Sequence, residues 1–267
     1  MIPKIIHYCW FSGEPFPSKV QECIDSWHRH MPDWEFFLWD AAKIATIDNQ
    51  WLRECLSVKK WAFAADFIRL YAVEKFGGIY LDTDCIVRMS LDPFLLHQCF
   101  IGREWYVHID CFTTHHFLTS HCFGAEPHHP FIVRCLQYYD DRHFIRTFDD
   151  TLPANLRFDQ TLLPQIQSQI ATMMYGFDPN PSHTGVQQLE CLQPTFQSTL
   201  VIYPYNYFDC YDYKPFSYVQ HLALGGWSDH TRSEGGKVTL MYRIRYHFRK
   251  WLTRFLWRRG YILTPKQ

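Results

Sequence analysis

The chain has 267 residues, 47% hydrophobic and 20% charged, a composition that excludes a disordered protein and allows one large domain, or one domain with a tail. Its formal net charge of −1 is unevenly placed, because residues 237–267 carry nine of the 26 basic residues and no acidic one, which leaves 17 basic against 27 acidic residues elsewhere. An acidic body with a basic tail favours an anionic surface as partner and argues against nucleic acid.

The first elements predict a parallel α/β sheet. Residues 4–10 are apolar and rich in β-formers, as expected for a buried first strand. Ser18 can cap a helix that runs to about His30, and residues 34–39 have the pattern of a second strand. A strand, helix, strand order is typical of parallel sheets flanked by helices.

The clearest helix is predicted for residues 61–76, where apolar side chains recur at helical spacing and Gly77-Gly78 provides the stop. A short strand, residues 79–81, follows and runs directly into Asp82-Thr83-Asp84. Because ligands bind at the carboxyl ends of strands in open α/β sheets, the two aspartates are predicted to lie at a binding edge.

The rest of the chain is less regular, and no domain boundary is evident before about residue 236. The predicted division is therefore a domain of residues 1–236 and a tail of residues 237–267. Further segments with a recognisable pattern are helices at 131–139 and 153–170, a late strand at 201–205, and loops at 176–199 and 211–227.

Asp82 and Asp84 are candidate ligands of a divalent cation, since a hard cation takes carboxylate oxygens and a nucleotide-sugar diphosphate completes its ligand shell. Such a cation offsets charge on the departing nucleoside diphosphate. A D-x-D pair is also common in surface turns, but here it follows a strand and a helix that ends in two glycines. Asp66 and Arg69, three residues apart on that helix, are either an exposed ion pair or contacts to ribose, base, phosphate or sugar.

Residues 61–84, WAFAADFIRLYAVEKFGGIYLDTD, resemble the donor-site block of family 32 glycosyltransferases, which include bacterial capsule and O-antigen enzymes and fungal initiating mannosyltransferases. The glucosylating clostridial toxins have a similar block. Residues 2–13, IPKIIHYCWFSG, look like the first strand of the same family. The resemblance covers residues 1 to about 90 and is weaker at 124–130. It implies a GT-A fold, a Rossmann-like mixed sheet flanked by helices, and a nucleotide-sugar donor used with Mn²⁺ or Mg²⁺.

The resemblance also implies roles for single residues. Around the nucleotide, Trp10 would stack on the base, Asp66 would hold ribose or base, and Arg69 would contact phosphate or sugar. At the motif, Asp82 would touch ribose and a metal-bound water and Asp84 would bind the metal directly. Thr83 between them completes this part of the expected donor site.

A late segment, His221 to Ser228, resembles the family's C-terminal His…Gly-Ser-Trp element. His221 is either a third metal ligand or a loop histidine packed on the aromatic tail. Gly226 stands where the family usually has Ser, and Ser228 follows Trp227, so a direct hydroxyl contact to the donor could come from Ser228. Gly226 would let backbone N–H groups approach the diphosphate, and these three residues are expected donor contacts.

Asp159 and Gln160 are candidates for contact with the donor sugar or the acceptor hydroxyl, the alternative being a polar pair on a helix surface; Asp110 is a weaker candidate.

Members of the family retain anomeric configuration. Double displacement would need a carboxylate nucleophile, which the sequence does not reveal, so we expect front-face attack with a donor phosphate oxygen taking the acceptor proton. The predicted catalytic set is Asp82, Asp84, Arg69 and Asp159.

Residues 240–259 predict a basic amphipathic C-terminal helix, which would either lie in an anionic membrane interface or dock on the body. The ten cysteines form no C-x-x-C pair, the first residues do not have the pattern of a secretory leader, and no apolar stretch reaches the ~20 residues that span a bilayer. We therefore expect free thiols and a cytoplasmic location, peripheral on the inner face of the plasma membrane if the tail binds it.

Together these patterns predict a metal-dependent retaining glycosyltransferase that moves a hexose or N-acetylhexosamine from a UDP- or GDP-sugar to a glycan acceptor, in the first place a lipid-linked one in surface polysaccharide synthesis. Two alternatives stay open: a nucleotide-sugar or glycan-binding protein without turnover, and a metal-dependent phosphohydrolase. The intact polar residues of the donor block argue against the first, and the single D-x-D, with no second metal cluster in the sequence, argues against the second.

Overall fold

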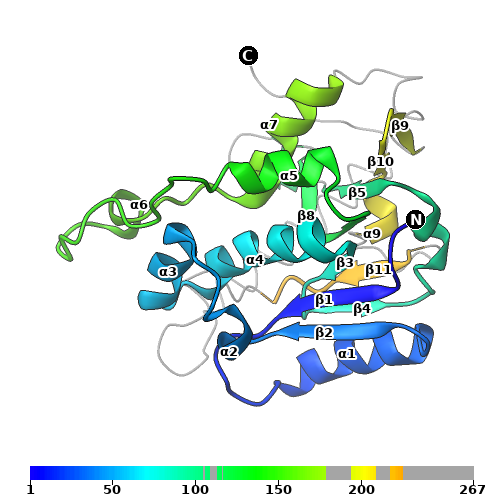
Figure 1. Cartoon of the computed structure of the whole chain (residues 1–267), viewed down its shortest axis with the longest axis horizontal. Helices are drawn as coiled ribbons and strands as arrows, with labels where there is room; N and C mark the ends of the chain where they lie inside the picture. Colours follow the sequence, from blue (N-terminus) through cyan, green and yellow to red (C-terminus); the bar gives the residue numbers. More distant parts are fainter. Residues whose placement is uncertain (105, 109–112, 116, 179–193, 209–216, 225–267) are drawn as a thin grey trace.

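The computed structural model of the chain describes residues 1–104, 106–108, 113–115, 117–178, 194–208 and 217–224 (Figure 1). Several residues singled out by the sequence lie outside this part: Asp110, Gly226, Trp227, Ser228 and the tail, residues 237–267.

A seven-stranded mixed sheet forms the centre of the molecule, in the order β2-β1-β3-β8-β5-β10-β9. β1 runs parallel to β2 and β3, while β8 is antiparallel to both β3 and β5. This is the Rossmann-like mixed α/β sheet that the resemblance predicted. Its strands are β1 (Ile5–Cys9), β2 (Glu35–Trp39), β3 (Gly78–Leu81), β5 (Cys99–Arg103), β8 (Leu118–Ala125), β9 (Thr195–Gln197) and β10 (Leu200–Tyr203).

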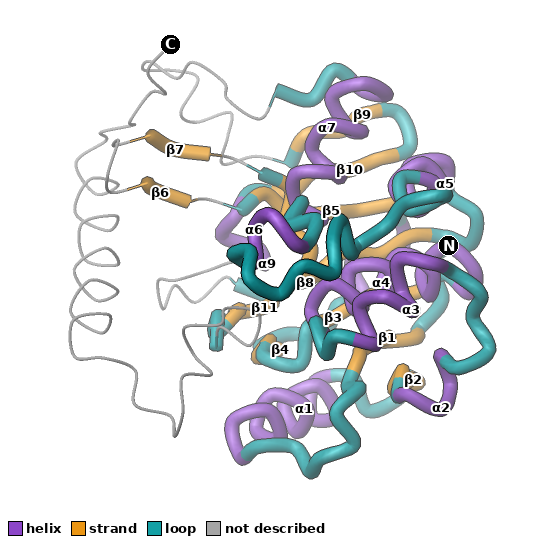
Figure 2. The backbone as a smooth tube through the Cα atoms, turned by 90° about the vertical axis from the view of Figure 1, so that its left-hand side faces the viewer, coloured by secondary structure: helices purple, strands orange, loops and turns teal. Residues whose placement is uncertain are grey.

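Two short two-stranded sheets accompany the main sheet. β4 (Cys85–Val87) pairs with β11 (Val219–His221), and β6 (Tyr106–His108) pairs with β7 (Thr113–His115). Figure 2 shows β4 and β11 side by side at the edge of the body. The described helices are α1 (Ser18–His30), α2 (Ala41–Ile44), α3 (Gln50–Ser57), α4 (Trp61–Phe76), the 3₁₀ helix η1 (Asp92–Leu96), α5 (Pro130–Gln137), α6 (Ala154–Arg157), α7 (Leu163–Tyr175) and α9 (Tyr205–Phe208).

Helices cover both faces of the sheet, and alternate residues of each strand point to opposite faces. In β3, Tyr80 joins the core under α3, α4, α5 and α7, whereas Ile79 and Leu81 join the core under α1 and η1 (Figure 1). The face of α1 that the sequence predicted to be apolar is buried there, with Trp27 wholly inaccessible. No helix among the described residues is both long and apolar enough to cross a bilayer.

The junction between α4 and β3 depends on its two glycines. Gly77 has φ +65° and Gly78 φ +96°, values that L side chains rarely adopt. A Cβ on Gly78 would also lie 2.7 Å from the carbonyl oxygen of Ile5, so β3 can approach β1 only with glycine at this position. The predicted helix, stop and strand are confirmed, and they bring Asp82 to the carboxyl end of the sheet's third strand.

Some sequence predictions were wrong. Ser18 does not cap its helix, because it is the first helical residue and Pro17 precedes it without a side-chain bond. The helix expected over residues 153–170 is two helices, α6 and α7, since Asp159 accepts hydrogen bonds from the N–H and the hydroxyl of Thr161 and turns the chain between them.

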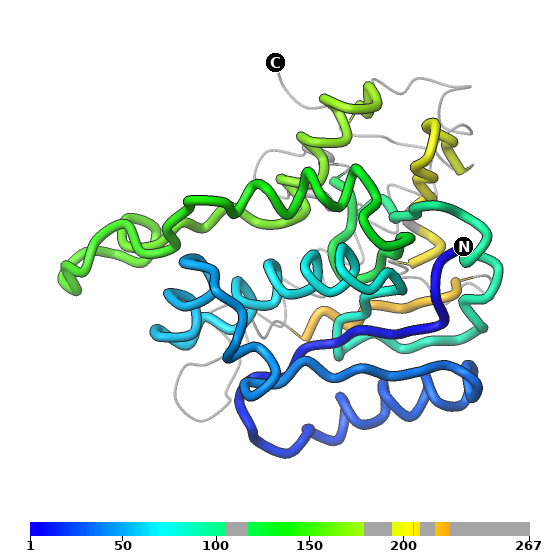
Figure 3. The backbone as a smooth tube through the Cα atoms, viewed as in Figure 1, coloured from blue at the N-terminus to red at the C-terminus, as the bar shows by residue number. Residues whose placement is uncertain are grey.

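Two segments predicted as loops contain short strands, β9 and β11, and β5 and β8 were not recognised in the irregular middle of the chain. Residues 140–162 form an arm that projects from the body, with α6 in it (Figure 3). The base of the arm is tied to α3, where the Glu54 carboxylate accepts from the N–H of Ile145 at 2.9 Å and from Nδ1 of His143 at 2.8 Å.

Candidate active site

The D-x-D residues lie in the turn that joins β3 to β4. Asp82 donates its backbone N–H to the carbonyl of His121 on the neighbouring strand β8, and its own carbonyl accepts from the N–H of Cys85; both distances are 3.0 Å. The turn is therefore held to the sheet on one side and closed on itself on the other. Thr83, between the two aspartates, is partly exposed.

Pairing of β4 with β11 brings a residue far along the chain to this turn. In the antiparallel register His221 lies opposite Cys85, and the carbonyl of Asp84 accepts the N–H of Leu222 at 3.0 Å. The side chain of Asp84 accepts a second backbone N–H, from Leu224, also at 3.0 Å. Asp84 and His221 are 137 residues apart in the sequence, and the three-residue strand β11 brings them together.

Asp82, Asp84 and His221 offer ligand atoms that all lie within 4.8 Å of one another. Nε2 of His221 is 3.2 Å from Oδ1 of Asp84, and the three side chains keep 25%, 18% and 19% of their surface exposed. Two carboxylates and an imidazole, open to solvent on one side, suit a hard divalent cation such as Mn²⁺ or Mg²⁺ that takes further oxygen ligands from elsewhere. Burial alone would raise the pKa of Asp84, but His221 and the Leu224 N–H outweigh it and hold that pKa well below its usual value.

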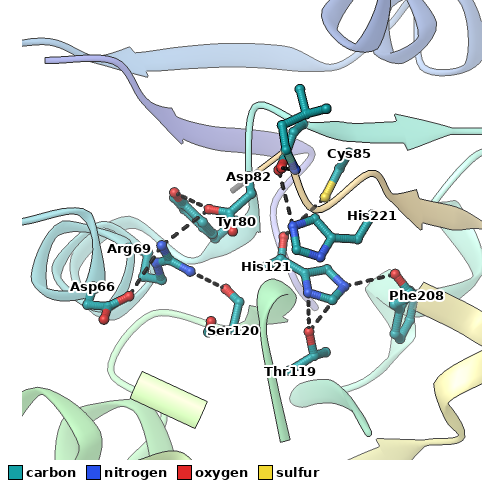
Figure 4. A network of polar contacts seen from close by, with 12 residues as sticks. Asp66, Arg69, Tyr80, Asp82, Cys85, Thr119, Ser120, His121, Phe208 and His221 are labelled. Atoms are coloured by element: carbon teal, nitrogen blue, oxygen red, sulfur yellow. Dashed lines mark hydrogen bonds and ion pairs between the residues drawn. The ribbon is translucent and has the colours of Figure 1, made fainter. Parts of the chain in front are cut away.

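A second cluster adjoins the motif through Arg69 of α4 (Figure 4). Its Nη2 is 3.3 Å from Oδ1 of Asp66 and 3.2 Å from Oδ1 of Asp82, and its Nη1 donates to the carbonyl of Ser120 at 2.8 Å. The guanidinium also lies over the ring of Tyr80, 4.6 Å from its centroid. Arg69 thus cross-links the helix to the D-x-D turn.

The exposed ion pair considered from the sequence is wrong, because the side chains of Asp66 and Arg69 are only 11% and 6% exposed. Burial raises the pKa of Asp66 to about 6, with Arg69 opposing the rise. Burial disfavours the charge on Arg69, yet the neighbouring Asp82, Tyr80 and Asp66 raise its pKa overall, so the guanidinium stays cationic. Asp66 and Arg69 therefore form a buried ion pair beside the D-x-D motif. Their expected contacts to ribose, base or phosphate stay predictions.

Trp10 follows β1, the strand beside β3, and so lies at the same edge of the sheet as the D-x-D turn. Its indole is half-buried, donates Nε1–H to the carbonyl of Glu14 at 2.7 Å and packs edge-to-face on Phe16 at 5.2 Å. An aromatic face at this edge is compatible with base stacking, which remains a prediction.

Asp159 occupies a different environment from the one expected. Its carboxylate is 8% exposed, and it lies 3.2 Å from Arg146 and 3.5 Å from Arg142 at the base of the arm. It is neither on a helix surface nor in the group formed by Asp82, Asp84 and His221. Gln160 beside it is exposed. Among the described residues the structure therefore gives Asp159 an ion-pairing role, and its contact with a sugar stays a prediction.

Four residues of the site were missed by sequence reasoning: Tyr80, Glu104, Thr119 and His121. Tyr80 donates its hydroxyl to Oδ1 of Asp82 at 2.9 Å, and strand alternation could have placed these two side chains on one face. Glu104 directly follows β5, which runs in the same direction as β3, and burial raises the pKa of Glu104 while His221 opposes the rise. No local signal revealed Glu104 or His121, because both depend on β5 and β8.

Comparison with known proteins gives one family match and several curated relatives. Residues 17–101 match the family described as "Glycosyltransferase sugar-binding region containing DXD motif". Over 144 residues the chain is 31% identical to inositol phosphoceramide mannosyltransferase 3 of Schizosaccharomyces pombe, covering 51% of this chain and 36% of that one. Over 216 residues it is 24% identical to human alpha-1,4-N-acetylglucosaminyltransferase, covering 79% and 52%.

Among solved structures, the PaToxG glycosyltransferase is similar with a TM-score of 0.44 at 17% identity, over 64% of this chain and 69% of that one. The chain spans about half the length, or less, of the curated relatives it matches. The family match contains the α4–β3 block with both aspartates of the motif, whereas Trp10 and His221 lie outside it.

Proposed function

Because the chain carries the DXD-containing sugar-binding region of glycosyltransferases, we propose that it is a metal-dependent retaining glycosyltransferase that uses a UDP- or GDP-sugar. The observation that supports this best is the convergence of Asp82, Asp84 and His221 within 4.8 Å at the end of β3, beside the buried pair Asp66–Arg69. A cation held there would offset the charge of the departing nucleoside diphosphate.

The donor sugar is a hexose or N-acetylhexosamine, and the acceptor is a glycan, in the first place a lipid-linked one in surface polysaccharide synthesis. The names of two relatives support the two classes of donor sugar, one being an inositol phosphoceramide mannosyltransferase and the other an N-acetylglucosaminyltransferase. Activity assays with defined acceptors test two parts of this proposal, the role in surface polysaccharide synthesis and the lipid-linked acceptor.

Within this site Arg69 has a positioning role. It holds Oδ1 of Asp82 at 3.2 Å while Tyr80 donates to the same oxygen, which leaves the second oxygen of that carboxylate for ribose or a cation-bound water. The buried positive charge also makes the edge favourable for a diphosphate. Trp10 at the neighbouring strand end would stack on the base.

The first test is calorimetric binding of UDP and GDP, each with Mn²⁺ and with EDTA. We expect one nucleotide to bind in a metal-dependent manner, and Asp84→Ala to abolish that binding and turnover, a loss of at least about 100-fold since it removes a charged ligand. Asp25→Ala removes an exposed carboxylate on α1 and is the matched control. This variant should bind the nucleotide as the wild type does. Undiminished metal-dependent binding by Asp84→Ala would disprove the metal assignment.

Front-face attack is proposed for the chemical step, and Glu104 makes it testable. Glu104 directly follows β5, two strands from β3 in the sheet, and its pKa responds to the charges of His221 and Asp82, so it is a carboxyl group near the site that can be tested as a nucleophile. If it were a nucleophile, Glu104→Gln would abolish turnover and the wild type would carry a glycosyl group on Glu104 during reaction. We expect neither, as judged by mass spectrometry of the quenched enzyme and by the rate of the variant.

A further inference from the structure

The rings of His121 and His221 lie flat against each other. Their centroids are 4.1 Å apart and their planes differ by 19° (Figure 4). Two rings in such contact restrict each other, because a turn of either one about its Cβ–Cγ bond would drive its edge into the face of the other. The face of His121 therefore forms one wall of the space that holds the ring of His221, whose Nε2 is 3.2 Å from Asp84.

His121 is itself firmly held. It lies within β8, is 3% exposed, and uses both ring nitrogens: one neutral tautomer donates Nε2–H to the carbonyl of Phe208 at 2.9 Å and accepts the hydroxyl of Thr119 at Nδ1 at 2.6 Å. With both nitrogens engaged, the ring offers its neighbour a face and no ligand atom. Its backbone carbonyl meanwhile accepts the N–H of Asp82.

His121 thus contacts both ends of the candidate metal site, Asp82 through its backbone and His221 through its ring. We propose that His121 is a positioning residue, whose ring fixes the orientation of the His221 imidazole so that Nε2 is directed at the Asp82–Asp84 pair. The inference rests on the proposed function and adds a support residue to its cation site. Supports of this kind change metal affinity by about 10- to 100-fold, since an unsupported ligand must be ordered when the metal binds.

Two substitutions separate the ring face from the hydrogen bonds. His121→Phe keeps a flat ring against His221 but loses both ring hydrogen bonds, whereas His121→Gln loses the face and keeps an amide N–H that can reach the carbonyl of Phe208. A purely structural role would make the variant with fewer hydrogen bonds the weaker cation binder. Positioning predicts the reverse order, with His121→Gln binding Mn²⁺ about 10- to 100-fold more weakly and His121→Phe staying close to the wild type.

The experiment is a calorimetric titration of Mn²⁺ into the full chain without nucleotide, for both variants and in a His221→Ala background. If His121 acts through His221, His121→Gln should weaken binding no further once His221 is absent. A second measurement needs no metal. The ring protons of His221 should show an upfield NMR shift from the stacked ring in the wild type and in His121→Phe, and lose it in His121→Gln.

Unchanged Mn²⁺ affinity in His121→Gln would overturn the inference while leaving the metal site intact. The same holds for a loss that persists in full without His221, because the effect would then not pass through that ligand. A wild-type chain that binds no Mn²⁺ would overturn the proposed metal site and this inference with it, and the wild type alone would reveal that case.

Discussion

The buried side chain of His7 makes the stability of this fold depend on pH. It is 2% exposed, its Nε2 lies 2.9 Å from the carbonyl of Gly77, and its Nδ1 lies 3.3 Å from the indole N–H of Trp39. These partners suit one neutral tautomer, in which Nε2–H donates and Nδ1 accepts. A second ring proton would face the Trp39 donor, so protonation opposes the native packing of β1.

We expect stability to fall in acid because of this residue. Burial lowers the pKa of His7 from 6.5 to about 4 in the folded chain, so the unfolded chain takes up the proton first. Neutral His7 contributes to the free energy of unfolding, fully above pH 6.5, and this contribution is lost as the pH falls through about 4. It amounts to about 3 kcal/mol.

Urea unfolding of the wild type and of His7→Gln, which cannot titrate, measures this contribution between pH 7 and pH 4. The variant should be less stable at pH 7, and the difference in unfolding free energy should shrink steadily as the pH falls. A difference that is the same at both pH values would show that protonation of His7 is not coupled to folding.

The element on which the site depends most is the sharp passage from α4 into β3. Nine residues of α4 are buried, so the helix is embedded rather than amphipathic, and it delivers Asp66 and Arg69 to the interior. Two left-handed glycines then reverse the chain into a strand only four residues long. The polar groups of the helix and the D-x-D turn are therefore placed by one rigid connection.

Gly78→Ala should strongly destabilise the chain and weaken donor binding. The new Cβ would need the unfavourable φ of +96° and would meet the Ile5 carbonyl at 2.7 Å, which only a shift of β1 or β3 can relieve. We expect a loss of at least about 2 kcal/mol in unfolding free energy, since strained backbone and a close contact add.

The matched control is Gly176→Ala at the end of α7. That glycine also has a positive φ, +68°, but a Cβ there would meet no atom within 4 Å. It should cost only the conformational penalty, about 1 kcal/mol, and leave donor binding unchanged. If thermal or urea unfolding showed the same loss of stability for the two variants, the close approach of β3 to β1 would not contribute to stability.

For the whole molecule, the uneven charge suggests a two-part organisation in which an acidic catalytic domain is brought to a membrane by residues 240–259. This proposal rests on sequence, because the tail lies outside the described residues. It would place the protein in the cytoplasm, at the inner face of the plasma membrane, where a lipid-linked acceptor is within reach.

Liposome flotation tests the tail. The full chain should float with vesicles that contain anionic lipid and less so at high salt, and a chain without residues 240–267 should not. Vesicles of neutral lipid are the control for surface charge, and nucleotide binding by the shortened chain is the control for folding. Equal flotation of both chains would locate membrane binding elsewhere or exclude it.

The arrangement of the α4–β3 block was predictable because its signals are local. Helical spacing, two glycines, a buried strand and two aspartates follow one another within residues 61–84, so each predicts its neighbour. The same holds for β1, α1 and β2, whose boundaries agree with prediction to within about a residue. The resemblance to glycosyltransferases with a DXD motif, confirmed by the family match, rests on this continuous stretch.

Sequence by itself thus determined β1, β2 and β3, the D-x-D turn at a strand end and the resemblance to glycosyltransferases with a DXD motif. Only the tertiary structure decided that Asp66 and Arg69 are buried, that Asp159 pairs with arginines of the arm, and that His121 stacks on His221. The contact between His121 and His221 depends on β8 pairing with β3 and on β11 pairing with β4, whereas the pairing of Asp159 depends on the fold of the arm, where Ile145 bridges to Phe158. β4 and β11, with three residues each, are too short to show a periodic pattern, and β8 is buried along almost its whole length, so no alternation of polar and apolar residues marks it.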